Sequence, residues 1–180
     1  MAARDILPFR SSGGGGARKY SARMDATADF DEGDVVAITA AGDVIESITE
    51  VDPAVPTETV GIAAVASQSV ANARTGDNLL ATAATNGEQI QYYSWADTDT
   101  EWITSNITAD DDAVLDEVPL ESQIGDLCNL RTSSGDWGIS VHASGDHRVF
   151  QITDVLDAEY KPVGISGNAG VHAVFRRLTL

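Results

Sequence analysis

The sequence predicts an all-β protein, a small β-barrel or β-sandwich of about ten short antiparallel strands, with an extended flexible N-terminal arm. Short apolar or alternating stretches recur at intervals of roughly 8–12 residues, which is the strand spacing typical of such folds. The dipeptide Gly-Asp occurs six times at the ends of these stretches, and both residue types favour turns. No helical periodicity extends over more than about ten residues.

The first half of the body carries two hairpin signals. Residues 30–48 alternate in polarity on both sides of a turn at 41–43, which predicts a β-hairpin. Asn86-Gly87 is the strongest short-range hairpin signal, because both residues tolerate the positive φ of a type I′ turn. The other strands expected in this half, including the two that flank Asn86-Gly87, are 60–66, 77–85, 88–95 and 100–107.

The second half repeats this pattern of short strands and polar turns. The strands expected there are 126–132, 137–143, 148–155, 162–166 and 171–180. Between the two halves, residues 108–117 begin with a helix N-cap residue, Thr108, and predict one short helix. The body, residues 25–180, therefore has a possible boundary between two lobes near 108–120, and the sequence leaves open whether it forms one closed sheet or two lobes.

Residues 1–24 differ from the body in charge and composition. They contain five basic residues against one acid, a net charge of +4, whereas residues 25–180 carry −21 and the whole chain −17. Four consecutive glycines, 13–16, bury nothing and are costly to order. This asymmetry predicts a flexible basic arm on an acidic body. The body's charge argues against binding to nucleic acid or to an anionic membrane.

No set of residues in the sequence predicts catalysis, a cofactor or a metal ion. His142, Ser144, Asp146 and His147 resemble the parts of a nucleophilic triad, but a tight loop would point them apart and no G-x-S-x-G elbow is present. The acidic stretches 97–101 and 110–112 lack the spacing of a calcium loop and are expected to be solvated. Cys128 is the only cysteine, so it forms no disulfide within the chain. We therefore expect a protein that is not an enzyme.

No stretch approaches the roughly 18 apolar residues of a membrane span, and the first residues lack the apolar core of a signal peptide. We expect the protein to be made in the cytoplasm and to act there or leave by a route other than secretion.

The ordered motifs resemble those of tailed-bacteriophage head decoration proteins, also called cement proteins. The resemblance covers roughly residues 30–66 and 124–180. It is carried by "FDEGDVVAITAAGDVIE", "VGIAAVA", "IGDLCNLRTSSGDWGISV", "RVFQITDV" and "VHAVFRRLTL".

This resemblance implies a non-catalytic protein made in the host cytoplasm and located on the outer capsid surface of the virion, where it binds the major capsid protein and cements neighbouring capsomers. It also implies a homo-trimer or dimer on the capsid, with an arm that anchors onto adjacent subunits. The arm residues expected to bind the capsid are Ile6, Leu7, Phe9, Arg10, Arg18, Lys19 and Arg23.

Two other functions fit a protein of this composition. The first is a carbohydrate- or receptor-binding domain of the virion surface, with Tyr92, Tyr93, Trp95 and Trp102 as a sugar platform. Burial of these rings in a core is the alternative, and we favour burial. The second is an acidic mimic of DNA, which only the net charge suggests.

Overall fold

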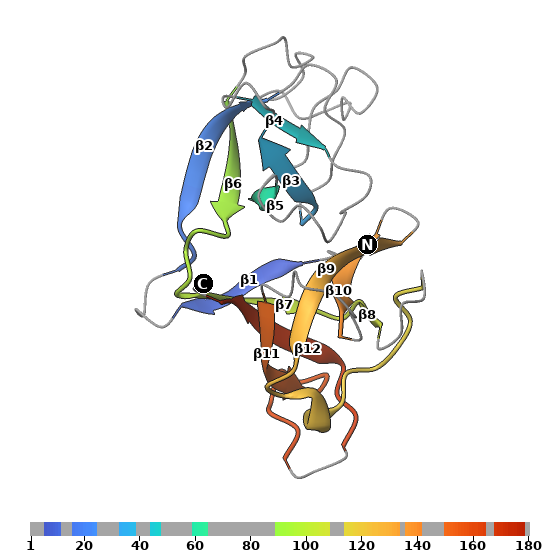
Figure 1. The fold of residues 1–180 in the computed structure, drawn as a ribbon. Coiled ribbons are helices and arrows are strands. Elements are labelled where there is room, and N and C mark those ends of the chain that lie inside the picture. Colours follow the sequence, from blue (N-terminus) through green and yellow to red (C-terminus); the bar gives the residue numbers. More distant parts are fainter. Residues whose placement is uncertain are drawn as a thin grey trace, which may run out of the picture. The chain divides into compact units, whose positions relative to one another are not determined.

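The computed structural model describes residues 6–11, 16–24, 33–38, 44–47, 59–64, 89–108, 114–133, 136–141, 150–164 and 168–178. These residues form twelve β-strands and one short 3-10 helix (Figure 1), so the predicted all-β class is confirmed. The chain divides into two compact units, each made of segments that are distant in sequence. Unit 1 comprises Met1–Ala17, Thr49–Pro56 and Asp97–Leu180, and unit 2 comprises Arg18–Ile48 and Thr57–Ala96.

Unit 1 contains a seven-stranded sheet in the order β1-β7-β12-β11-β9-β10-β8. Its neighbours are antiparallel except for the parallel pair β10 and β8. The strands are β1 (Leu7–Ser11), β7 (Thr100–Thr104), β8 (Ile107–Thr108), β9 (Leu127–Ser133), β10 (Asp136–Ser140), β11 (Phe150–Leu156) and β12 (His172–Arg177).

The core of unit 1 is built from aromatic and β-branched side chains of neighbouring strands. On β12, Ala173, Val174 and Phe175 are all buried, and because successive strand residues point to opposite faces, both faces of this strand are covered. The Phe175 ring meets Phe150 of β11 edge to face, with ring centroids 5.6 Å apart. This geometry is favoured by the quadrupoles of the two rings.

Unit 2 is a small closed barrel of five strands in the ring order β2-β4-β3-β5-β6. The ring closes because β2 pairs with β4 in parallel and with β6 antiparallel. The strands are β2 (Lys19–Met24), β3 (Val35–Ile38), β4 (Val44–Ser47), β5 (Thr59–Ala63) and β6 (Gln89–Ser94). The buried residues of β3 and β5 are small or β-branched, namely Val35, Val36, Ala37, Ile62 and Ala63.

Most of the expected strands are confirmed within the described residues, and two expected elements differ from the structure. The hairpin predicted for 30–48 is the antiparallel pair β3 and β4. The predicted helix is not seen in residues 114–117, the part of 108–117 that follows the gap at 109–113, and a 3-10 helix, η1 (Glu121–Gln123), follows instead. In 162–164, the described part of the strand expected at 162–166, there is only an isolated bridge between Pro162 and Leu156. The expected strand 77–85 and the Asn86-Gly87 turn lie outside the described residues.

The division into a separate arm and one body is wrong for the described residues. Segment 6–11 supplies β1 at one edge of the sheet in unit 1, and segment 16–24 supplies β2 in the barrel of unit 2. Charge misled the prediction because basic residues such as Arg10 and Lys19 occupy exposed positions of these strands, while Ile6 is buried. The proposed boundary near 108–120 lies within unit 1. Of the four consecutive glycines, Gly13, Gly14 and Gly15 lie outside the described residues.

Candidate binding surface

Three apolar residues of the predicted arm, Ile6, Leu7 and Phe9, pack within unit 1. Ile6 is 0% exposed, and Leu7 and Phe9 pack against a buried cluster of Ile103, Leu156 and Val174. They reach this cluster because β1 pairs antiparallel with β7, placing Leu7 opposite Ile103. The capsid-binding role expected of these three side chains stays a prediction, and the structure shows that Ile6 is buried while Leu7 and Phe9 use part of their apolar surface within the chain.

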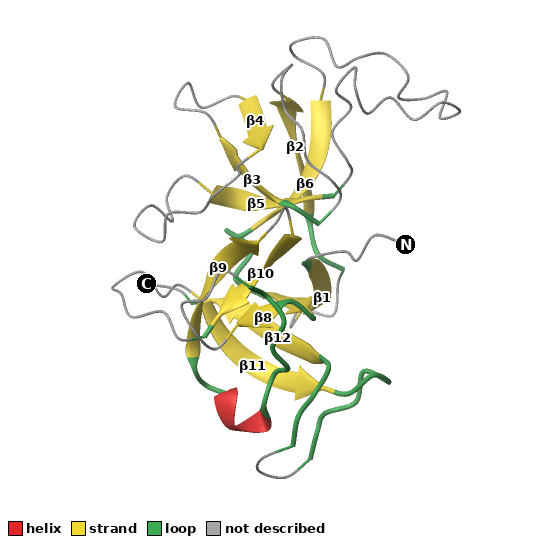
Figure 2. Ribbon diagram, turned by 90° about the vertical axis from the view of Figure 1, so that its right-hand side faces the viewer, coloured by secondary structure: helices red, strands yellow, loops and turns green. Residues whose placement is uncertain are grey.

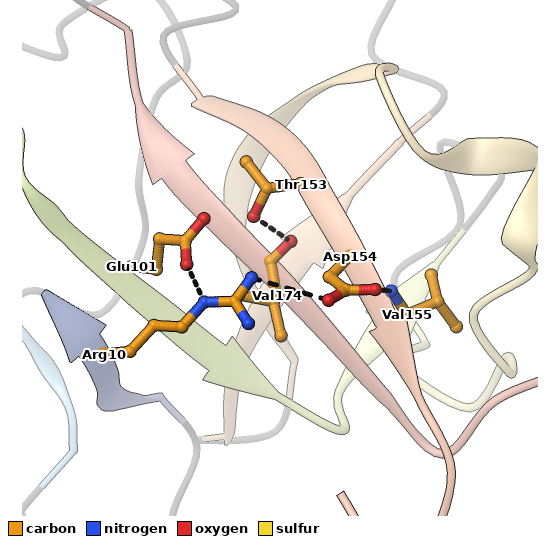
Figure 3. Close-up of polar contacts among 6 residues, drawn as sticks. All are labelled: Arg10, Glu101, Thr153, Asp154, Val155 and Val174. Carbon is orange, nitrogen blue, oxygen red and sulfur yellow. Dashed lines mark hydrogen bonds and ion pairs between the residues drawn. The ribbon is translucent and has the colours of Figure 1, made fainter. Parts of the chain in front are cut away.

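Arg10 joins β1 to two other strands of the same sheet (Figure 3). Its Nε donates a hydrogen bond to a carboxylate oxygen of Glu101 on β7, and its Nη2 lies 3.4 Å from Oδ2 of Asp154 on β11. The hydrogen bond to Glu101 raises the pKa of the guanidinium above its usual value. The Arg10 side chain is about half exposed, so we expect each pair to contribute about 0–1 kcal/mol. Arg10 thus helps to hold β1 against the sheet through its contacts with Glu101 and Asp154.

The other three basic residues expected to bind the capsid, Arg18, Lys19 and Arg23, lie on β2 or just before it, in unit 2. The guanidinium of Arg18 lies 5.1 Å from the ring centroid of Tyr20, and the Lys19 ammonium lies 5.4 Å from that of Tyr93. Both distances fit cation–π interactions. Arg23 pairs through its backbone with Val44 and Gln89, and its side chain lies outside the described part of the chain. The seven predicted residues are thus divided between the two units.

The predicted sugar platform is not formed either. Trp95 is 1% exposed and belongs to unit 2, whereas Trp102 is 0% exposed and belongs to unit 1. Tyr92 is half-buried, and this burial raises the pKa of its hydroxyl. Two indole rings enclosed in separate units offer no exposed face to a sugar.

Cys128 and the acidic stretch 97–101 lie within the described residues. Cys128 is fully buried, which raises the pKa of its thiol, so it is held in the unreactive protonated form. In the acidic stretch 97–101, Asp97 accepts a hydrogen bond from Thr100 at 3.0 Å and Glu101 is paired with Arg10. Among the described residues, no group of three or more His, Cys, Asp or Glu side chains is placed to hold a metal ion.

Several residues that the sequence offers for chemistry fall between the described segments. His142, Ser144, Asp146, His147 and the run 110–112 all lie outside the described residues. A search of the described parts of the chain for a helix long and apolar enough to cross a membrane finds none.

One end of unit 1 exposes large apolar side chains. We define the tip surface as Val118, Leu120, Ile124, Tyr160 and Val171, each exposed by 37–58%. They come from three segments held together by backbone hydrogen bonds. The Gly170 N–H donates to Pro119 O at 2.7 Å, the Glu121 N–H to Asn168 O at 3.0 Å, and the Val171 N–H to Leu156 O at 2.7 Å. Figure 2 shows η1 and the loop after β11 at this end of unit 1.

Tyr160 has a fixed and unusual position in the tip surface. Its φ is 61°, the one positive φ of a non-glycine residue within the described ranges. Its ring stacks on His172, with centroids 4.8 Å apart and an interplanar angle of 2°. Burial lowers the pKa of His172 below its usual value, which favours the neutral imidazole at pH 7. The stacking on His172 and the backbone conformation together fix the orientation of the Tyr160 ring.

A network around Asp157 holds the loop that carries Tyr160. Asp157 Oδ1 accepts hydrogen bonds from the backbone N–H groups of Lys161 at 3.0 Å and Glu159 at 2.8 Å. These bonds lower the pKa of the Asp157 carboxyl, because they favour its charged form. The Asp157 N–H donates to Lys161 O at 2.8 Å, and the Tyr160 N–H to Asp157 O at 3.1 Å. The loop is therefore closed by four hydrogen bonds.

Acidic side chains surround the tip surface in the sequence. Segments 114–126, 156–164 and 168–172 contain six acids, Asp116, Glu117, Glu121, Asp126, Asp157 and Glu159, against one base, Lys161, for a net charge of −5. Sequence reasoning missed this surface because its apolar residues follow neither a helical nor a strand period. The only signal was a cluster of Val, Leu and Ile in 114–124 next to acids and a proline.

Comparisons of the chain with protein-family models, with curated proteins and with solved structures gave no match.

Proposed function

We propose that this chain is a structural protein of a bacteriophage virion that binds the outer surface of the icosahedral capsid and cements neighbouring capsomers. On this proposal it is made in the host cytoplasm, has no catalytic role, and contacts the major capsid protein. The resemblance to head decoration proteins supports it. The segments that carry the resemblance include β3 to β5 in unit 2 and β9 to β12 in unit 1.

The observation that carries the proposal is the tip surface. Large apolar side chains that are gathered at one place and rimmed by polar residues are typical of protein-binding surfaces. Here they are exposed on a chain whose net charge of −17 otherwise favours solubility. Exposed apolar side chains of this kind are expected in a protein that binds another protein through them. The proposed anchor is therefore the tip surface, in place of the N-terminal arm that the sequence favoured.

Oligomerisation is proposed to occur on the shell. Like charges on neighbouring copies repel one another in free solution, so contacts with the capsid have to hold the copies together. A trimer or dimer around a local symmetry axis would present several tip surfaces to the shell at once, which raises the overall affinity through effective concentration.

Cosedimentation tests the proposal directly. The purified protein is mixed with undecorated heads, both unexpanded and expanded, of the phage or prophage that encodes it, and bound protein is measured in the pellet. We expect saturable binding, with ordered clusters on the heads in electron micrographs and heads that resist heat better. If the protein bound neither unexpanded nor expanded heads and bound selectively on a glycan array, the carbohydrate-binding function would be favoured instead.

A further inference from the structure

We infer that the tip surface binds a protein surface with an apolar centre and a rim of Lys and Arg side chains. This inference rests on the proposed function, because it describes the patch of the capsid protein that the tip surface recognises. Exposure, rigidity and charge each support it.

The exposed residues of the tip surface have the chemistry of an interface centre. Tyr160 is 58% exposed and Val118 57% exposed, and tyrosine is enriched among residues that dominate binding energy. One face of the Tyr160 ring is covered by His172, so a partner would meet the other face or the edge of the ring. A surface of this kind gains affinity only against apolar groups that displace its water.

The tip surface is held rigid before any partner arrives. The Tyr160 loop is closed around Asp157, and segment 168–172 is bonded to both 119–121 and Leu156. The backbone at Gly170 lies close to the end of β11: a Cβ on Gly170 would lie 2.4 Å from Cγ1 of Val155 and 2.8 Å from Leu156 O. A preorganised surface loses less conformational entropy on binding than a flexible one.

Charge decides between the occupants of the tip surface. A second copy of this chain would bring its own acidic segments 114–126, 156–164 and 168–172, with a net charge of −5, against those of the first, and like charges across an interface disfavour that pairing. Nucleic acid and anionic lipid are disfavoured for the same reason. A partner whose apolar patch is rimmed by Lys and Arg is complementary in both respects.

Apolar-to-polar variants test the centre of the surface. Val118→Ser and Val171→Ser change exposed side chains, so we expect unchanged melting by circular dichroism. The double variant should bind heads at least about tenfold more weakly than the wild type. Val114→Ser is the matched control, because Val114 is 51% exposed and lies outside the tip surface, on the other side of the Glu117–Ile107 bridge in the chain. Equal binding by the double variant and the control would overturn the inference.

Charge-reversal variants test the rim. Asp116→Lys and Asp126→Lys should together weaken binding, more strongly at 0.01 M salt than at 0.15 M, because the Debye length falls from about 30 Å to about 8 Å. Asp99→Lys, an exposed acid of unit 1 outside the rim, is the control and should bind like the wild type. Stronger binding by the rim variant would show that the partner's rim is acidic and would overturn the inference.

A test without heads separates this inference from the proposed function. A chromatography resin that carries benzyl and quaternary ammonium groups presents the two chemistries together. The wild type should be retained longer than the Val118→Ser/Val171→Ser variant, with Val114→Ser like the wild type. If the Val118→Ser/Val171→Ser variant were retained as long as the wild type, and the wild type did not bind heads, both the inference and the proposed function would be rejected. A wild-type-specific retention without head binding would reject only the capsid as partner. A dimer lost in the variant, seen by light scattering, would replace the inferred partner with a second copy.

Discussion

Tyr160 occupies a backbone region that costs a non-glycine residue about 1–2 kcal/mol. Its φ of 61° is maintained because Asp157 accepts a hydrogen bond from the Lys161 N–H in the same loop and because the Tyr160 ring stacks on His172. Strain of this kind is kept where surrounding structure determines it, and it occurs most often at functional sites. The position of the ring at the tip surface fits that association.

Two substitutions separate the backbone of Tyr160 from its ring. Tyr160→Ala loses the stack on His172 and keeps the unfavourable φ, whereas Tyr160→Gly loses the stack and relieves the φ. We therefore expect the free energy of unfolding of the glycine variant to be about 1 kcal/mol higher than that of the alanine variant. Urea titration followed by fluorescence measures this difference. Both variants should bind heads equally weakly, because both lack the ring; equal stability of the two would contradict the argued strain.

Single residues show where sequence reasoning reached its limit. The positive charge of Arg10 was visible in the sequence, but its partners, Glu101 and Asp154, lie 91 and 144 positions away. Nothing local indicates such a pair. The burial of Trp95 and Trp102 was the favoured alternative and is confirmed, because large apolar rings in strand-forming stretches are most often packed in cores. The tip surface depends on contacts between three distant segments and was not predictable.

At the level of the element, two glycines permit close backbone approaches, one in each unit. A Cβ on Gly61 of β5 would lie 1.8 Å from the carbonyl oxygen of Tyr93 on β6, and one on Gly138 of β10 would lie 2.2 Å from Asn106 O. In each case the obstacle is backbone, which cannot rotate away. These glycines are therefore required by packing between neighbouring elements.

Gly61→Ala should distort the barrel of unit 2. Overpacking of this kind costs about 1–3 kcal/mol, and hydrogen exchange should show the largest loss of protection in β5 and β6. The matched control is Gly164→Ala, because no atom of the described residues lies within 4 Å of a Cβ at Gly164 and its φ is not positive. The control should change the free energy of unfolding by no more than about 0.5 kcal/mol. Equal melting temperatures for the two variants would refute the packing role of Gly61.

Elements were easier to predict than their partners. The alternation in 30–48 and the apolar run at 60–66 gave strands and one hairpin, because these patterns are local. Pairing between distant strands has no local signal, which explains why β1 and β2 were mistaken for an arm. Each lies next to strands from later in the chain, Leu7 opposite Ile103 and Lys19 opposite Tyr93.

At the scale of the molecule, the first 24 residues contribute to both units. β1 covers the apolar cluster of unit 1 with Leu7 and Phe9, and β2 completes the barrel of unit 2 between β4 and β6. Loss of β1 would expose apolar surface at about 25 cal/mol per Å² and would leave Glu101 and Asp154 without Arg10. Loss of β2 would open the ring and leave two unpaired strand edges, which promote aggregation.

Deletion of residues 1–24 should therefore destroy the cooperative fold, contrary to what an independent acidic body would do. We expect residues 25–180 to melt without a sharp transition, to bind a hydrophobic dye, and to aggregate at concentrations where the full chain is soluble. Circular dichroism, dye fluorescence and light scattering measure these three outcomes. The control is the full chain with Arg18→Ser and Lys19→Ser, which removes two exposed cation–π contacts worth about 0.5–1 kcal/mol each and keeps both strands. If the deleted chain melted as cooperatively as this control, β1 and β2 would be accessory to the fold, and the N-terminal residues would again be free to act as an arm on the capsid.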